Sequence, residues 1–334
     1  MIRINKVFLG VGDANAMAKV SDSVNYQAGE LLVTLERYVA GTKTVATSSN
    51  TPSGAKSVIT FSESVIQTNP GAFSTSQRVY VSTDLLCTSG NYVLTVTNTK
   101  TKNVFTATTT AIPPIKESVS LPPICPPHYT VNTLDPNYQT EPGKSQAFIN
   151  YSLPDKTYYI RFVPNEAIIY QLIMRLHYMD YLNTGPAPAY VDYPFTNQFL
   201  KDASMISNSG PYITNTFKGS DFYDSFGASM LKNSRSIADI EKRKAYKIQY
   251  IVYSSTQDYA DYLEYSAPSL SIAQEKPLYS NFEGKKAIGI FAFRAMFTVE
   301  KEMDTDFISE FAHHHSTCTY KFYTNLNDPP SCDP

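Results

Sequence analysis

Residues 275–299, EKPLYSNFEGKKAIGIFAFRAMFTV, combine a turn-rich segment with a predicted strand. Turn-forming residues fill the first half, and a strongly alternating segment begins at Gly289. Both faces of that segment are largely apolar, which predicts a central strand covered on two sides. One face would carry Phe291, Phe293, Ala295, Phe297 and Val299, and the other Ile290, Ala292, Arg294, Met296 and Thr298. The loop before it suits the presentation of aromatic groups better than the placement of a nucleophile.

Residues 1–112 contain many short alternating segments, separated by turns rich in Thr, Ser and Asn. Gly90-Asn91 and residues 98–102 are the clearest turn signals. About seven short strands in about 110 residues predict an immunoglobulin-like β-sandwich, without the Cys and Trp pattern of antibody domains. The expected strands include 31–38, 57–61, 78–82, 92–97 and 104–108.

A proline-rich connector, residues 113–145, follows the sandwich. Six of the sixteen residues from Ile112 to Pro127 are proline, which fixes an extended backbone and removes hydrogen-bond donors. Two interpretations stay open for it: a semi-rigid connection between two units, or an ordered strap packed along the second unit.

Residues 146–334 are predicted to form a larger β-rich domain of the α+β kind, so that the whole chain is mainly β with a few short helices. Strands are expected at 158–163, 167–179, 246–253 and, last, 319–323; helices are expected at 196–206, 220–231, 257–265 and 304–315, the last with Asp304 as N-cap. In the longest strand Ile168, Tyr170, Leu172, Met174, Leu176 and Tyr178 share one face, and Gln171, Arg175 and His177 the other. Tyr246, Ile248, Tyr250 and Val252 repeat this pattern.

The composition points to an exported protein. With 28 Lys+Arg against 30 Asp+Glu and no basic cluster, nucleic-acid binding is not expected. Only 17% of the residues are charged, and 25 Tyr stand against no Trp, which suits β-rich proteins of the cell envelope. No apolar run approaches the roughly 20 residues of a membrane-spanning helix. The first residues lack the apolar core of a signal peptide, so we expect any targeting segment to lie upstream.

Four cysteines, Cys87, Cys125, Cys318 and Cys332, are widely scattered and form no CxxC pair, which argues against a zinc-finger site. Cys318 follows a helical pattern and Cys332 lies in a proline-rich tail. In an oxidising compartment a Cys318–Cys332 disulfide would tie down the C-terminus. Free buried thiols are the alternative.

The sequence predicts no catalytic, cofactor-binding or metal-binding residues. It contains no GxSxG, P-loop, GxGxxG or HExxH motif. The triplet His313-His314-His315 is expected at a solvated helix end, because consecutive helical residues point about 100° apart and cannot all face one metal ion. Asp258, Asp261 and Glu264 are interpreted as a solvated acidic helix face, with calcium binding as the alternative.

Aromatic residues crowd two segments of the second domain. Tyrosine gives wide contact area at little entropic cost, so exposed Tyr-rich loops suit recognition of a partner or a glycan. The alternative is that these rings cover the rim of the core. The candidate contact residues are Tyr181, Tyr190, Tyr193, Phe195, Tyr212, Phe222 and Tyr223.

Four short motifs carry a resemblance to a known family: IIYQLIMRLHY at 168–178, YADYL at 259–263, KPLYSNFEG at 276–284 and GIF at 289–291. With the β-sandwich start, they make the chain look like the Bacteroidota cell-envelope lipoproteins that carry a large domain of unknown function, often encoded near TonB-dependent outer-membrane transporters. The resemblance implies a non-catalytic protein at the outer membrane, anchored by lipid on an upstream cysteine, on the cell surface or the periplasmic face. Its expected partner is an outer-membrane β-barrel protein, either a transporter or a secretion channel.

These observations leave three candidate functions. The first is a lipid-anchored binding or accessory subunit of such an assembly. The second is an extracellular hydrolase with an immunoglobulin-like accessory domain, which requires a deep pocket with converging polar groups in residues 146–334. The third is a surface adhesin, which requires an exposed edge strand or strand exchange between copies.

Overall fold

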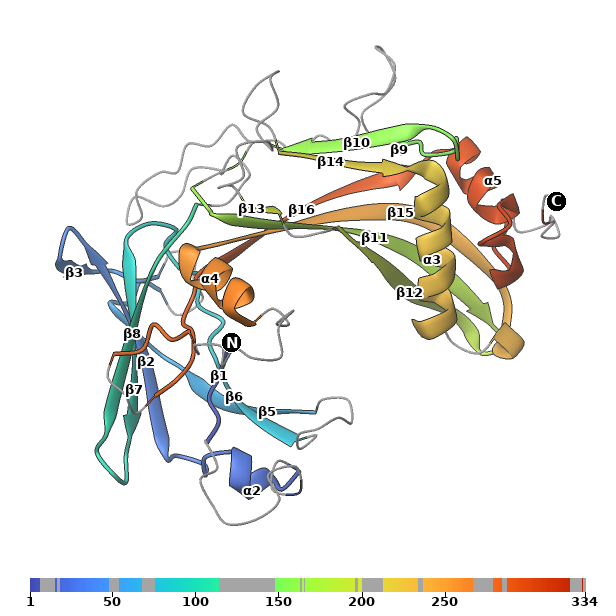
Figure 1. Cartoon of the computed structure of the whole chain (residues 1–334). Helices are drawn as coiled ribbons and strands as arrows, with labels where there is room; N and C mark the ends of the chain where they lie inside the picture. The colour runs from blue at the N-terminus through green and yellow to red at the C-terminus, as the bar shows by residue number, and fades with distance from the viewer. Residues whose placement is uncertain are drawn as a thin grey trace, which may run out of the picture. The chain divides into compact units, whose positions relative to one another are not determined.

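The structure is a computed structural model in which the chain divides into two compact units (Figure 1). It describes residues 1–6, 16, 19–47, 54–67, 76–113, 148–162, 164, 166–195, 198–199, 213–233, 237–266, 279–283, 287–324 and 332. Of these, unit 1 contains 1–113 and 256–293, and unit 2 contains 148–255 and 294–332. The fold is mainly β with several sheets and a few short helices, which confirms the predicted class.

Unit 1 is built on two antiparallel sheets that share one core. The first has the order β3-β2-β7-β8, with β4 also paired to β2: β2 (Leu31–Val39), β3 (Thr42–Thr44), β4 (Val58–Thr60), β7 (Asn91–Asn98) and β8 (Val104–Thr110). The second has the order β1-β6-β5: β1 (Ile2–Arg3), β5 (Ser62–Gln67) and β6 (Ser76–Val81). Alternate side chains of both sheets point into the core, among them Val33, Leu35, Ile59, Tyr80 and Leu94.

Tyr92, near the start of β7, supports the immunoglobulin-like interpretation. Its hydroxyl donates to the carbonyl oxygen of Cys87 at 2.7 Å and lies 2.8 Å from that of Ala46. A tyrosine at the start of this kind of strand, bonded back to the backbone a few residues upstream, is the tyrosine corner of immunoglobulin-like sandwiches. Burial raises the pKa of Tyr92, so the hydroxyl stays a donor at every physiological pH.

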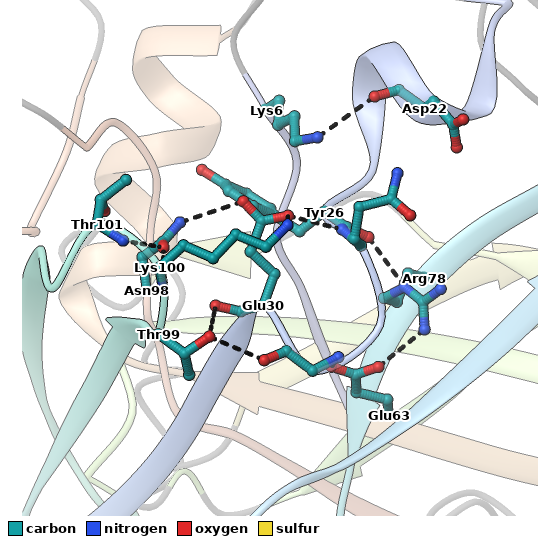
Figure 2. A network of polar contacts seen from close by, with 12 residues as sticks. Lys6, Asp22, Tyr26, Glu30, Glu63, Arg78, Asn98, Thr99, Lys100 and Thr101 are labelled. Atoms are coloured by element: carbon teal, nitrogen blue, oxygen red, sulfur yellow. Dashed lines mark hydrogen bonds and ion pairs between the residues drawn. The ribbon is translucent and has the colours of Figure 1, made fainter.

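A polar network ties the segment before β2 to both sheets of unit 1 (Figure 2). The Glu63 carboxylate accepts from the Gly29 N–H at 2.9 Å and from Arg78 at 2.8 Å. On the other side, Thr99 donates its backbone N–H to Glu30 at 2.8 Å, beside the β7–β8 turn that Asn98 caps. The short helix α2 (Ser21–Val24) joins through Lys6, which donates to the Asp22 carbonyl. The network therefore fixes how the chain enters the sandwich.

Residues 256–293 belong to unit 1, so the predicted single domain 146–334 differs from the observed division. The reason is pairing with β8: Phe282 bridges Ala107, and the Glu283 N–H donates to the Thr106 carbonyl at 2.9 Å. Phe282, Phe291 and Phe293 pack against the core of the sandwich. The helix α4 (Gln257–Ser266) confirms the helix predicted at 257–265. The proline-rich connector lies outside the described residues beyond Pro113.

The segment 289–299 is not one strand. Residues 287–293 lie in unit 1 without strand structure, and β16 (Arg294–Met303) begins only in unit 2. The prediction that both faces are covered is wrong: Phe297 is 8% exposed, but Met296 is 59% exposed. The physical reason is that Phe297 faces the core of unit 2 whereas Met296 lies on the opposite face of the sheet; among the described residues β16 pairs with β15 and with the two residues of β9.

Unit 2 contains a six-stranded sheet and a separate strand pair. The sheet has the order β12-β11-β15-β16-β9, and β13 also pairs with β11: β9 (Phe148–Ile149), β11 (Ile169–Leu182), β12 (Gly185–Pro194), β13 (Gln198–Phe199), β15 (Ile240–Ser255) and β16. The pair is β10 (Thr157–Phe162) and β14 (Ile213–Lys218). Its helices are α3 (Gly219–Asn233) and α5 (Thr305–His313), with the short turns η2 (Ile237–Asp239) and η3 (Cys318–Tyr320). Apart from β9, the pairings within the large sheet are antiparallel.

One face of the large sheet is buried under an aromatic layer. Tyr170, Leu172, Met174, Leu176 and Tyr178 are all 3% exposed or less, which confirms the predicted alternation of β11. Rings from the two helices complete this core, and the hydroxyls of Tyr151 and Tyr250 lie 2.8 Å apart within it. The contributing helix residues are Phe222, Tyr223 and Phe226 of α3 and Phe307 and Phe311 of α5.

Three predicted elements of unit 2 are corrected. A β-bulge between His177 and Tyr178 makes Tyr246 the extra residue of β15, so that Ala245 takes the buried position instead. The predicted strand 319–323 is instead η3 followed by an isolated bridge from Phe322 to Arg243. The predicted helix 196–206 lies outside the described residues except for 198–199, which form β13.

Several other local predictions for unit 2 are confirmed. Helix α3 covers the predicted 220–231, and the Asp304 carboxylate caps α5 by accepting from the Phe307 N–H at 2.8 Å. Cys318 and Cys332 form the predicted disulfide, and Cys87 is disulfide-bonded as well. The alternative of free thiols is therefore wrong for these cysteines.

We expect Tyr92→Phe to lower the free energy of unfolding of unit 1 by about 1–3 kcal/mol, because it removes the buried hydroxyl that donates to the Cys87 and Ala46 carbonyl groups. Tyr38→Phe on β2 is the matched control, since the Tyr38 hydroxyl donates to Glu36 at the surface. Urea unfolding of both variants measures the difference. Equal losses would show that the Tyr92 hydroxyl contributes no more than an exposed one.

In unit 2, Asp180→Ala is expected to cost about 3–5 kcal/mol, because it leaves the Arg243 guanidinium buried without its carboxylate. Asp192→Ala, which breaks the partly exposed pair with Arg175, should cost about 1 kcal/mol or less. Chemical denaturation of the two variants compares them directly. A small loss for Asp180→Ala would mean that water reaches Arg243.

Candidate partner-binding surface

The second face of the large sheet in unit 2, here called the open face, carries polar and aromatic side chains. Register places them together, because residues directly opposite each other in antiparallel strands share a face. Arg175 lies opposite Asp192 and Gln249, and His177 lies opposite Tyr190 and Lys247. The polar and aromatic residues of the open face include Gln171, Arg175, His177 and Tyr181 of β11, Tyr190 and Asp192 of β12, Tyr246, Lys247, Gln249 and Tyr253 of β15, and Arg294, Met296 and Glu300 of β16; Ile173, Ile251 and Thr298 lie between them.

The two faces of this sheet differ in what covers them. The rings of α3 and α5 lie on the buried face: Tyr193 of β12 meets Phe222 and Phe226 of α3, and Tyr178 of β11 meets Phe322, which in turn contacts Phe311 of α5. Figure 1 shows β12, β11, β15 and β16 running side by side with both helices in the same unit. On the open face, by contrast, the side chains named above are half-buried or exposed, although Ile251, which lies between Gln249 and Tyr253 on the same face, is buried.

Arg175 holds Tyr190 in place while leaving the ring accessible. The guanidinium makes a bidentate pair with Asp192, at 2.7 and 3.0 Å, and its carbon lies 4.0 Å from the centroid of the Tyr190 ring. The hydrogen bond to Asp192 raises the pKa of Arg175, so its charge is permanent. Tyr190 is nevertheless 56% exposed. The result is a rigid aromatic ring presented to solvent, which loses little entropy when a partner covers it.

A second cation–ring pair lies on β15 and β16. The guanidinium carbon of Arg294 is 3.8 Å from the centroid of Tyr253, and the same group donates to the Gln171 amide oxygen at 3.1 Å. Met296, beside Tyr253 in the register, is 59% exposed. Two arginine–tyrosine pairs with an exposed methionine therefore line one sheet face, and Arg, Tyr and Met are all enriched at protein interfaces.

His177 lies between Tyr190 and Tyr246. Its ring centroid is 6.3 Å from those of Tyr190 and Tyr246, and its Nε2 is 3.3 Å from the Gln249 amide oxygen. Burial lowers the pKa of His177, with Lys247 acting in the same direction and the Gln249 bond opposing it. Among the described residues, the hydrogen-bond partner of His177 is the amide of Gln249, and the Glu300 carboxylate acts on the ring only through its charge. Its neutral ring extends the aromatic surface.

The structure separates the seven predicted contact residues. Tyr181 and Tyr190 lie on the open face. Tyr193 and Phe195 are half-buried and contact rings on the core side. Phe222 and Tyr223 are fully buried, so their prediction as contact residues is wrong: they are core residues of α3. Tyr212 lies outside the described residues.

Residues on this surface that the aromatic-loop argument missed are Tyr246, Tyr253, Arg175 and Arg294. The signal that could have found them is the alternation of the two long strands, which already placed Arg175 and His177 together on the polar face of β11. Extending the polar face of β11 to the neighbouring strands identifies this surface, whereas counting aromatic residues in loops does not.

Two other candidate groups are placed differently from expectation. Asp258 of α4 accepts from the Tyr279 hydroxyl at 2.9 Å and from Thr109 at 3.4 Å, so it is bonded within unit 1. Among the histidines, α5 ends at His313, whose Nδ1 lies 2.7 Å from the Ser309 carbonyl, and His314 is already the C-cap. The premise that all three histidines follow one helix is therefore wrong.

Neither the protein-family models nor the curated proteins compared with this chain give a match. Within the described residues, no helix is both long and apolar enough to cross a membrane. What the protein does is therefore inferred from its surface chemistry and from the resemblance in its sequence.

We expect the ring protons of His177 to titrate below its ordinary pKa of 6.5. A pKa lowered in the folded state means that the unfolded chain binds the proton more tightly, so the contribution of His177 to stability is complete above about pH 6.5 and falls as the pH drops below it. NMR titration measures the midpoint, with the resonance assigned by its loss in His177→Gln.

Two variants separate the causes of this shift. Gln249→Ala should lower the midpoint further, because it removes a hydrogen bond that favours the charged ring. Tyr190→Ala should raise it, because it lets water reach the ring. A midpoint at or above 6.5 in the unaltered protein would contradict the described burial.

Proposed function

We propose that the protein is a non-catalytic, lipid-anchored subunit of the outer membrane that binds a β-barrel partner, a transporter or secretion channel, through the open face of unit 2. The observation that carries the proposal is the exposed Tyr190 ring fixed by Arg175. A solvated sheet face needs no such arrangement, since scattered Lys, Glu and Thr would keep it soluble.

The energetics of binding favour this surface. Binding hot spots are enriched in Tyr, Trp and Arg, and they work best where the side chain is already held in its bound conformation. Tyr190 and Tyr253 are both stacked on arginines at about 4 Å, and these arginines bond to Asp192 and Gln171. A partner that covers the open face would therefore bury aromatic area without first having to order it.

The compartment is supported by the cysteines. Cys318 and Cys332 are joined, and Cys87 is also disulfide-bonded. Structural disulfides persist in oxidising surroundings such as the periplasm and the cell surface, and they are rare in the cytosol. The lipid anchor and the choice of a β-barrel partner rest on the resemblance to the Bacteroidota envelope lipoproteins, and the disulfides support only the oxidising compartment.

A site-specific crosslink tests the proposal. A photoreactive phenylalanine analogue replaces Tyr190 in one variant and Leu231 in the other, and both are expressed in the cells that make the protein. Leu231 is the control because it is 77% exposed on α3, in the same unit. We expect ultraviolet light to join position 190, and not position 231, to an integral outer-membrane β-barrel protein.

The same experiment can refute the proposal. Crosslinks from position 190 only to other copies of this chain would indicate a self-assembling adhesin, and no crosslink at all would indicate a free surface. In purified complexes, Tyr190→Ala should weaken binding at least about tenfold if Tyr190 is a hot spot.

A further inference from the structure

Asp224, His314 and His315 converge on one point of the surface of unit 2. Because α5 ends at His313, the C-cap His314 has an extended backbone (φ −56°, ψ 133°), and the chain turns there instead of continuing around the helix. The rings of His314 and His315 consequently lie 4.2 Å apart. Asp224 reaches them from α3, with its Oδ1 3.7 Å from Nε2 of His315. One donor atom of each residue lies within 4.8 Å of the other two.

We propose that these three side chains bind a divalent transition-metal ion, and that Zn²⁺ fits them best. Two imidazole nitrogens and a carboxylate oxygen are ligands that zinc takes at about 2.0–2.2 Å, which puts ligands about 3.3–3.5 Å apart in a tetrahedral site. The Asp224 and His315 atoms are 3.7 Å apart and all three ligand atoms lie within 4.8 Å of one another, so the side chains have to move closer together to reach that geometry. A fourth position is left for water or for a ligand from outside. Calcium and magnesium prefer oxygen ligands and match this set poorly.

The backbones that carry the three ligands are held together before any ion binds. Gly227 lies three residues after Asp224, on the same side of α3, and a Cβ at Gly227 would overlap the carbonyl oxygen of Ser316. The helix thus touches the turn directly, which only glycine allows. The Ser316 hydroxyl donates to the Asp224 carboxylate and orients it.

The turn after α5 is rigid in its own right. Both Thr317 and Cys318 donate their backbone N–H groups to the His314 carbonyl at 2.9 Å, and the Cys318–Cys332 disulfide begins at the same place. The His314 ring stacks on Tyr223, with centroids 4.5 Å apart and planes 21° apart. Most of the conformational entropy that assembling the site costs is therefore lost already when unit 2 folds. Only the side chains of Asp224 and His315 need to adjust when an ion binds.

The three proposed ligands differ in how exposed they are to solvent. His314 is 7% exposed, and its Nδ1 accepts from the Ser316 N–H at 3.3 Å. The side chains of Asp224 and His315 are 57% and 71% exposed, so an ion reaches the site from solvent. A plain His315–Asp224 ion pair would not account for the second imidazole, that of His314, placed beside it.

The proposal is tested by titrating Zn²⁺ into the full chain. The protein is prepared without a histidine-containing affinity tag and is first stripped of metal with a chelator. Calorimetry should show one saturable Zn²⁺ site, and Zn²⁺ should raise the melting temperature. Asp224→Asn and His315→Ala should each weaken Zn²⁺ binding at least about tenfold, because even outer-shell changes at metal sites cost about 10–100-fold. His313→Ala is the matched control, since it alters the same histidine run outside the site, and it should leave the affinity unchanged.

Two further readings make the outcome decisive. Metal-free melting temperatures of the exposed variants should match that of the parent protein, and the visible spectrum of bound Co²⁺ should report nitrogen ligands that are lost in His315→Ala. The proposal is overturned if the double variant Asp224→Asn, His315→Ala binds Zn²⁺ as the parent does, if Ca²⁺ binds as tightly as Zn²⁺, or if the parent shows no saturable site.

Discussion

The buried ion pair between Asp180 and Arg243 is the constraint on which the arrangement of unit 2 depends. The two side chains are 1% and 0% exposed, and Arg243 Nε lies 2.7 Å from the Asp180 carboxylate. Removing charges from water costs several kcal/mol per ion, and the cost is recovered only if the partners meet with good geometry. Strands β11 and β15 therefore have one acceptable register at this end. Arg243 also bonds through its backbone to Lys321 and Tyr323, which fixes the C-terminal segment against the sheet.

Both surfaces of interest follow from this register. The bulge at Tyr246 changes the parity of β15, so that Ala245 and Arg243 face the core while Tyr246 joins the side of His177. Beyond the bulge, β11, β12, β15 and β16 place their polar and aromatic residues on the open face. The C-terminal segment that Arg243 holds continues from the turn that presents His314 and His315 to α3. A single buried pair thus supports a candidate partner surface and a candidate metal site on the same unit.

The alternation of buried and exposed residues in the strands and the N-cap of α5 could be predicted from the sequence, but the tertiary contacts could not. The pattern of β11 predicted its buried residues, and Asp304 and the apolar residues of α5 predicted that helix. The bulge at Tyr246 has no signal in the alternation, because it depends on the partner strand. The apparent strand 289–299 misled because Phe291 and Phe293 are apolar for the core of unit 1, whereas Phe297 is apolar for the core of unit 2. Aromatic crowding near Phe222 and Tyr223 marked a core, and the end of α5 at His313 decided which histidines converge.

Protection of the open face in the native envelope is the most direct measure of whether this surface is occupied. Hydroxyl-radical labelling, read out by mass spectrometry, compares Tyr190, Tyr253 and Met296 between purified protein and intact outer membranes. Occupation predicts that these three side chains are labelled in the purified protein and protected in membranes, while Leu231 and Tyr262, both exposed elsewhere, are labelled equally in the two samples. Equal labelling of Tyr190 in both samples would contradict the assignment of the open face as a binding surface.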